Sequence, residues 1–129
     1  MNKVKNILRF LILISIVFII NQTKLEAIGN VDWILLKENK DGKEWLDLGS
    51  LKVFNNSEIS VLTRFYKNPS KDKNNAETTL YVMRINCKTK EYKDTSINGI
   101  PQFKSSWQKS YDDELLDIVL DRSCSEAGL

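Results

Sequence analysis

Most of the chain between residues 31 and 97 consists of short segments in which apolar and polar residues alternate or strand-forming residues dominate. Side chains of a β-strand point alternately to the two faces of a sheet, so this pattern predicts strands. Asn39 to Gly42 suit a hairpin turn, and Gly49 with Ser50 predicts a break. We predict strands over residues 31–37, 43–48, 58–66, 78–87 and 91–97, with a short apolar segment over residues 51–54.

The two longest predicted strands each have an apolar face. One face consists of Ile59, Val61, Thr63 and Phe65, and the other of Tyr81, Met83 and Ile85. Residues 67–77 between these strands contain Pro, Asn, Ser and charged residues without periodicity, which predicts a long exposed loop. Trp33 in the first strand is predicted to lie in the core, because a large aromatic side chain contributes much buried area.

After Pro101 the apolar spacing becomes that of a helix. Ser110 is predicted as the N-cap, and acidic residues in the first turn favour the positive end of the helix. The helical spacing is set by Leu115, Leu116, Val119 and Leu120. The predicted fold class is therefore α+β, an antiparallel sheet of about five or six strands with one C-terminal helix packed on it.

The first 27 residues follow the three-part pattern of a secretory signal peptide. A basic start precedes the apolar run of residues 10–20, and a polar segment ends at Ala27. The apolar run has about 11 residues, whereas spanning a bilayer takes about 20. We predict a signal peptide over residues 1–27 and a single domain over residues 28–129, with no stable membrane span after cleavage. An uncleaved anchor is the alternative.

Cleavage changes the charge of the protein. Of the 19 basic and 17 acidic side chains, four basic and one acidic lie in residues 1–27, which leaves 15 and 16 and a net charge of −1. A nearly neutral domain has no overall field that would concentrate nucleic acid, so we expect no nucleic-acid partner. The protein is predicted to be periplasmic, secreted or associated with the cell surface.

Cys87 and Cys124 are the two cysteines of the chain. Export delivers them to an oxidising compartment, and a domain of about 100 residues gains from a covalent link, so we expect them to form a disulfide. Two buried free thiols are the alternative. Two cysteines in a chain without histidine do not suit a zinc site, and we predict no metal and no cofactor.

The composition removes most classes of enzyme. Without histidine there is no Ser–His or Cys–His nucleophile pair, and the five glycines do not form a phosphate-binding loop. Carboxylates remain, at Asp112, Asp113, Glu114, Asp117 and Asp121. Such groups serve glycosidases or bind calcium, but we interpret them as the acidic first turn and the solvated face of a helix. We predict that the protein is not an enzyme; a small carboxylate-dependent hydrolase is the alternative.

Two lysine-rich loops and one tryptophan are the candidate binding residues. If the predicted hairpins bring the loops together, the lysines form a patch for an anionic ligand, although acidic residues lie among them. Trp107 is flanked by lysine and serine residues and is the tryptophan most expected to be exposed. The candidates are Lys67, Lys71, Lys73, Lys88, Lys90 and Trp107.

The order of several residues resembles the surface-adhesin protein E family, over roughly residues 31–124. The matching features are Asp32 and Trp33, Trp45 and Asp47, the apolar strand at 59–65, Cys87, Tyr92, Gly99, Trp107 and Cys124. Trp45 stands where tyrosine is more usual, and the chain lacks the lipid-attachment cysteine of the namesake adhesin. The resemblance implies an antiparallel sheet with a packed helix, a Cys87–Cys124 bridge, pairing into homodimers in some members, and no catalysis.

Two functions are compatible with these features. The first is an exported, non-catalytic binding module with a protein or glycan ligand, which the resemblance extends to host or matrix proteins. The second is a periplasmic structural or accessory protein that acts on a partner in the envelope.

Overall fold

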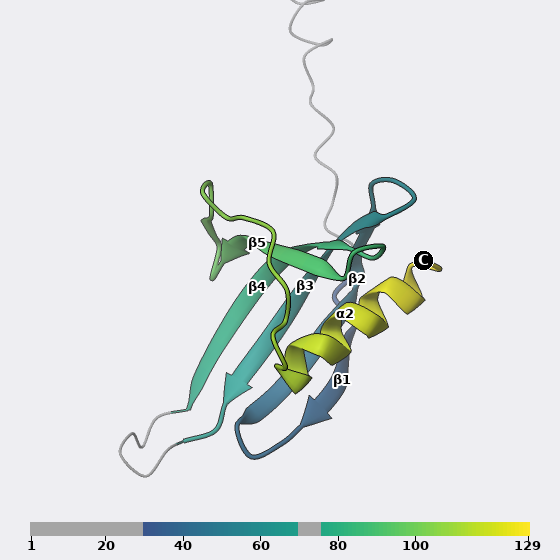
Figure 1. Cartoon of the computed structure of the whole chain (residues 1–129). Coiled ribbons are helices and arrows are strands. Elements are labelled where there is room, and N and C mark those ends of the chain that lie inside the picture. The colour runs from purple at the N-terminus through teal and green to yellow at the C-terminus, as the bar shows by residue number, and fades with distance from the viewer. Residues whose placement is uncertain (1–29, 70–75) are drawn as a thin grey trace, which may run out of the picture.

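The computed structural model describes residues 30–69 and 76–129 and confirms the predicted fold class (Figure 1). Six antiparallel strands follow one another in the sheet in chain order, and a helix packs on one face. The elements are β1 (Trp33–Glu38), β2 (Gly42–Val53), β3 (Glu58–Lys67), β4 (Glu77–Asn86), β5 (Glu91–Ile97), β6 (Ile100–Pro101) and α2 (Glu114–Glu126).

Asparagine side chains hold three of the turns between strands. The Asn39 Oδ1 atom accepts hydrogen bonds from the backbone N–H groups of Asp41 and Gly42, at 2.8 and 3.1 Å. Asn55 Oδ1 accepts in the same way from the N–H groups of Ser57 and Glu58, where β3 begins, and Asn86 Oδ1 from those of Lys88 and Thr89 in the turn after β4. An asparagine side chain that bonds the backbone two or three residues ahead fixes a tight turn, which is why consecutive strands pair.

The predicted break at Gly49 and Ser50 is wrong, because β2 continues through it as a bulge. The pairing with β3 shifts between Asp47 and Lys52. The Asp47 Oδ1 atom accepts hydrogen bonds from the N–H groups of Gly49 and Asp32, at 3.0 and 2.7 Å, and Ser50 Oγ donates to the Asp47 carbonyl. These side chains satisfy backbone groups that the bulge removes from the ladder. A Cβ atom on Gly49 would lie 1.9 Å from the Asn30 carbonyl oxygen, so only glycine fits there.

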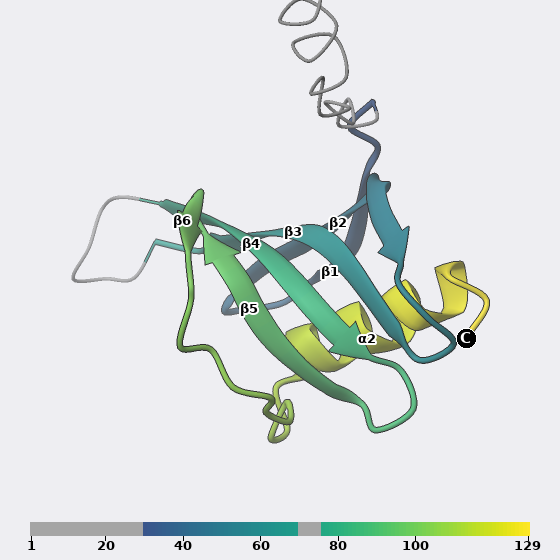
Figure 2. The same cartoon turned by 90° about the horizontal axis from the view of Figure 1, so that it is seen from above.

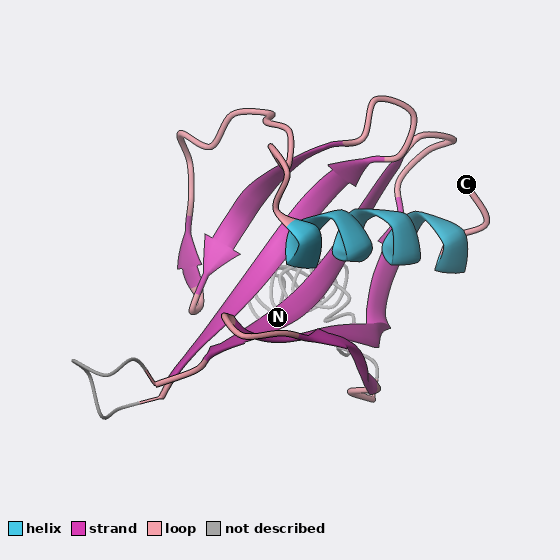
Figure 3. Ribbon diagram, turned by 60° about the horizontal axis from the view of Figure 1, so that its bottom comes forward, coloured by secondary structure: helices cyan, strands magenta, loops and turns pink. Residues whose placement is uncertain are grey.

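Helix α2 crosses one face of the sheet and encloses the core (Figures 2 and 3). The apolar faces predicted for β3 and β4 both point toward the helix, which confirms those alternations. The buried residues of the core are Leu46, Ile59, Val61, Met83 and Ile85 from the sheet and Leu115, Val119, Leu120 and Cys124 from the helix. Each long aliphatic side chain buried in this way stabilises the fold by about 1.5–3 kcal/mol.

The helix begins later than predicted, and its N-cap is Asp113 rather than Ser110. The Asp113 Oδ1 atom accepts hydrogen bonds from the N–H groups of Leu115 and Leu116, at 3.0 and 3.2 Å. The two preceding residues, Tyr111 and Asp112, have φ angles of 48° and 67°. A backbone in this left-handed region cannot be part of an α-helix, so the chain becomes helical only at Glu114.

The disulfide predicted between Cys87 and Cys124 is present, with the two Cα atoms 5.6 Å apart. It joins the residue after β4 to the last turns of α2, on the buried side of the helix. The C-terminal helix is therefore fixed covalently to the end of β4, as well as by apolar contact with the sheet. No helix in residues 30–69 and 76–129 is long and apolar enough to cross a membrane. The predicted signal peptide, residues 1–27, lies outside the described residues and stays a prediction.

Removing the disulfide should destabilise the protein markedly. The bridge closes a loop over a sequence separation of 37 residues, and the C87S/C124S variant should lose about 4 kcal/mol of unfolding free energy on the chain-entropy model. Urea denaturation of the oxidised protein and of the variant measures the difference. A loss below about 1 kcal/mol would contradict a role for the bridge in limiting the unfolded chain.

The cap can be tested separately. Asp113→Ala should cost about 1 kcal/mol, because two N–H groups at the start of α2 lose their acceptor. Asp113→Asn keeps a capping oxygen and should stay within a few tenths of a kcal/mol of the wild type. Equal losses for the two variants, measured by thermal denaturation, would show that the carboxylate acts by some means other than capping.

Candidate functional site

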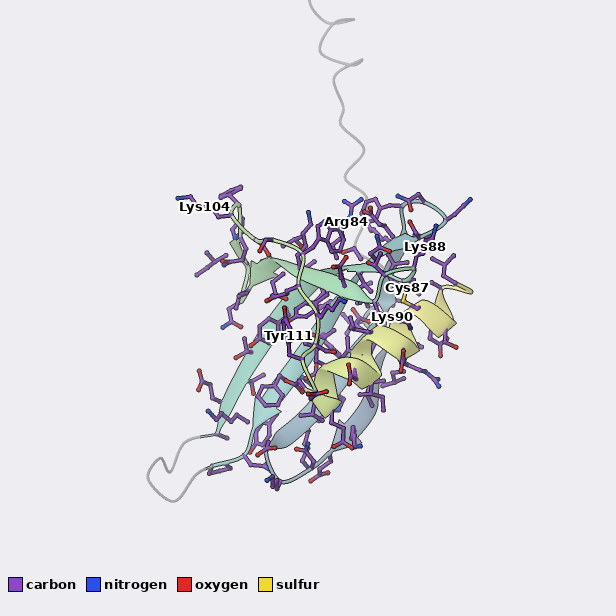
Figure 4. All side chains as sticks on the ribbon, in the orientation of Figure 1. Arg84, Cys87, Lys88, Lys90, Lys104 and Tyr111 are labelled. Atoms are coloured by element: carbon purple, nitrogen blue, oxygen red, sulfur yellow. A yellow bond between two sulfur atoms is a disulfide. The ribbon has the colours of Figure 1, made fainter. Side chains whose placement is uncertain are left out.

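Among the described candidates, the structure does not bring Lys67 together with Lys88 and Lys90. Lys67 ends β3 and pairs with Glu77 at the start of β4. Lys88 and Lys90 lie on the turn after β4, near Cys87 and the far half of α2 (Figure 4). The ten residues of β4 therefore separate Lys67 from Lys88 and Lys90 by about 30 Å. Lys71 and Lys73 lie outside the described residues.

The candidates that the structure describes have different surroundings. Lys90 Nζ donates a hydrogen bond to Asp121 Oδ1 at 2.7 Å, so its charge is paired with α2. Lys67 and Lys88 are exposed. Trp107 is 37% exposed, and the Lys93 ammonium lies 4.8 Å from the centroid of its ring, in cation–π geometry. Binding by any of these residues stays a prediction.

The face of the sheet opposite α2, which we call the open face, carries an arginine between two tryptophans. The Arg64 guanidinium carbon lies 4.8 Å from the ring centroid of Trp33 and 4.4 Å from that of Trp45. The prediction that Trp33 lies in the core is therefore wrong: it is half-buried beneath Arg64, on the side that the helix leaves uncovered.

The pairing register continues this stack into a row across four strands. Leu35 pairs with Trp45, Trp45 with Arg64, and Arg64 with Leu80. Paired residues of neighbouring strands share a face, so all four side chains belong to the open face. Leu35 is 52% exposed and Leu80 37% exposed. The row thus combines exposed aliphatic groups with a stacked cation.

A cavity of about 780 Å³ lies on the other face of the sheet, at the N-terminal end of α2. Its lining comes from the turn between β1 and β2, from β2 to β5, and from the residues that lead into the helix. Acidic and aromatic side chains dominate it, notably Glu44, Phe65, Tyr81, Tyr92, Asp94 and Tyr111. Figure 4 shows Tyr111 in front of the sheet, beside the start of the helix.

Glu44 is the most unusual residue of this cavity. Its alternation with Gly42 and Leu46 in β2 points it toward the helix, and it is only 6% exposed. Burial raises the pKa of the Glu44 carboxyl to about 7, although a hydrogen bond with Thr63 acts in the opposite direction. No basic side chain in the described residues forms an ion pair with it.

Other groups around the cavity are shifted in the same direction. Burial raises the pKa of the Asp94 carboxyl above its usual range. Burial also raises the pKa values of Tyr81 and Tyr92, and neighbouring acids add to the effect. Each shift favours the uncharged form, because the surroundings offer little compensation for negative charge.

Sequence reasoning missed the cavity residues Glu44, Tyr81, Tyr92, Asp94 and Tyr111 as a possible site. One signal was present for Glu44: it lies between Gly42 and Leu46 in a period-two pattern and so shares the inward face with a core leucine. The acidic residues that were predicted for the first turn of the helix do reach the site, since Asp112, Asp113 and Glu114 line the cavity. Asp121 does not, and pairs with Lys90 instead.

The arrangement offers binding chemistry more than catalysis. Aromatic rings and carboxylates together suit a positively charged ligand. No three Asp, Glu, His or Cys side chains within residues 30–69 and 76–129 are placed to hold a metal ion.

Comparison with known families agrees with the resemblance. The model of the surface adhesin-E family matches residues 34–129, from the second residue of β1 to the last residue of the chain. The chain belongs to the surface adhesin-E family. Membership implies an exported or surface location and suggests an adhesin-like role. No curated protein and no solved structure matches this adhesin-E chain at a significant level.

Burial of Glu44 predicts how the stability of this adhesin-E domain depends on pH. The unfolded carboxyl loses its proton above its ordinary pKa of 4.5, whereas the folded one keeps it until about pH 7. The folded state therefore binds more protons between these pH values, and the free energy of unfolding should fall by about 1–3 kcal/mol as pH rises through this window.

Glu44→Gln should flatten this pH dependence, because the amide stays neutral at every pH. Urea denaturation of the wild type and the variant from pH 4.5 to 8 measures the slope. Asp94→Asn is the matched variant, because burial shifts the pKa of the Asp94 carboxyl in the same direction. This variant should remove a smaller part of the pH dependence of the unfolding free energy. If the unfolding free energy of Glu44→Gln depended on pH as strongly as that of the wild type, the pH dependence could not be assigned to Glu44.

Proposed function

We propose that the protein is an exported, non-catalytic adhesin domain that binds a protein outside the cell, of the host or matrix class. The observation that supports this most strongly is the match of residues 34–129 to the surface adhesin-E family. The absence of histidine and of a phosphate-binding glycine pattern removes the usual nucleophile and nucleotide chemistry.

The open face is the surface that we assign to this contact. Tryptophan and arginine are the residues that most often dominate the energy of protein interfaces, and here they are stacked so that few rotamers remain to be fixed on binding. Leu35 and Leu80 flank the stack and are accessible to a partner. A sheet surface with exposed aliphatic groups beside a stacked cation suits another protein surface.

Binding to immobilised laminin, vitronectin and a glycan array tests the proposal, with the exported and oxidised protein as the analyte. We expect saturable binding to at least one protein ligand. Uniformly blank binding would refute adhesion, and capture by glycans alone would refute the protein ligand.

Charge on the open face should abolish that binding. The L35E/L80E variant places two carboxylates on exposed positions of β1 and β4 and should weaken binding at least about tenfold, as loss of a hot spot does. Phe103→Glu is the matched control: this residue is more exposed still but lies in the loop after β6. Urea denaturation checks that both variants stay folded. Equal weakening by both variants would overturn the assignment of the open face.

A further inference from the structure

The cavity beside the helix N-terminus has a marked excess of negative groups. Six of the described lining residues are acidic, and Lys40 is the one basic residue among them. Two of the acids are already engaged, because Asp113 caps α2 and Glu114 pairs with Lys37. Glu44 on β2 and Asp94 on β5 line the cavity from strands that β3 and β4 separate, and neither has an ion-pair partner in the described residues.

Glu44 distinguishes this cavity from a cluster of exposed acidic residues on the surface. Its side chain is almost completely buried, yet it lines the cavity and receives compensation only from the Thr63 hydroxyl. Burying a carboxylate without a cation is costly, and a leucine or glutamine of similar size would avoid the cost. A positively charged group that enters the cavity would supply the missing partner.

The aromatic lining defines what kind of cation fits. Phe65, Tyr81, Tyr92 and Tyr111 present ring surfaces, and Met83 and Leu116 add apolar surface. Rings bind cations through their faces, and they also bury the apolar stem that carries an organic cation. Tyr111 is 81% exposed, so its ring contributes to the cavity without being locked in the core.

We propose that this cavity binds an organic cation, an ammonium or guanidinium group on an apolar stem, with Glu44 as its counter-ion and the tyrosine rings around the stem. The group can come from a free amine or from a lysine or arginine side chain of a protein partner. The site lies on the helix side of the sheet and does not depend on the open face.

The test is a calorimetric and NMR titration of the exported, oxidised protein. The probes are butylamine, Nα-acetyl-lysine methylamide and Nα-acetyl-arginine methylamide, with the uncharged Nα-acetyl-norleucine methylamide as the matched control for the stem. We expect at least one cationic probe to bind with shifts at Tyr81 and Tyr92, and the norleucine probe to bind at least about tenfold more weakly, a difference of 1.4 kcal/mol. Equal binding of charged and uncharged probes, or calcium binding without amine binding, would overturn the proposal.

Comparison among the probes identifies the source of the cation. Binding of butylamine indicates that a free amine suffices. Binding restricted to the blocked amino acids indicates a side chain of a protein. Either result supports the shared chemistry, whereas no binding of any cationic probe refutes it.

Variants of single residues show whether the cavity residues themselves bind the cationic probe. Glu44→Gln should weaken the cationic probe about tenfold or more, and Tyr111→Ala, at an exposed position, about threefold. Asp121→Asn is the matched control, because this carboxylate lies on α2 outside the cavity and should leave affinity unchanged. Equal affinities of Glu44→Gln and Asp121→Asn would overturn the role of Glu44.

Binding should also depend on pH, because the cation binds the ionised form of Glu44. The probes stay charged between pH 6 and 8, and with a Glu44 pKa of about 7 the affinity should rise about tenfold across this range. The other charged or titratable groups around Glu44 are Lys37, which pairs with it in the register of β1 and β2, and the cavity residues Lys40, Asp41, Tyr81, Tyr92, Asp94, Asp112, Asp113 and Glu114. A rise that persists in Glu44→Gln would assign the effect to one of these and contradict the proposal.

Discussion

The contact between α2 and the sheet is the interaction on which the rest of this structure depends. A single layer of strands has two faces, and only the one beneath the helix is closed to water. Leu120 and Val119 from the helix and Ile59 and Leu46 from the sheet form that contact, and the Cys87–Cys124 bridge fixes the helix covalently above it. The position of the helix also determines the two surfaces to which we assign binding. The open face is the side of the sheet that the helix leaves uncovered, and the cavity forms where the helix starts.

The two surfaces have opposite chemistry, which follows from their positions. On the open face a cation is held by the rings of Trp33 and Trp45, within reach of solvent. On the helix side a carboxylate, Glu44, is removed from water beside Leu46 and gains protons more readily as a result. A buried carboxyl without a cationic partner costs a small domain stability that an apolar residue would provide, whether it holds its proton or carries an unpaired charge. The retention of Glu44 is understandable if a ligand supplies the compensating charge.

The sequence allowed the sheet and the helix to be predicted because their signals are local. Alternation at Ile59, Val61 and Phe65 and helical spacing at Val119 and Leu120 each need only a few neighbouring residues. The bulge at Gly49 could not be predicted, because the Asp47 carboxylate that stabilises it also bonds the backbone of Asp32, 15 residues away. Trp33 was misplaced for a related reason: β1 has apolar residues on both faces, and only tertiary packing decides which face the helix covers. The cavity combines residues from four strands and the helix, so no single segment contained its pattern.

The central claim is that the structure depends on the contact between the disulfide-linked helix α2 and the sheet. Amide hydrogen exchange tests it most directly, when it is measured on the exported protein before and after reduction of the disulfide. The account predicts that the amides of α2 are strongly protected in the oxidised protein and lose much of this protection on reduction. The central strands β2 and β3 should lose less, because their ladder hydrogen bonds do not involve the helix. Unchanged protection of α2 after reduction, or a helix that exchanges freely while the bridge is intact, would contradict it.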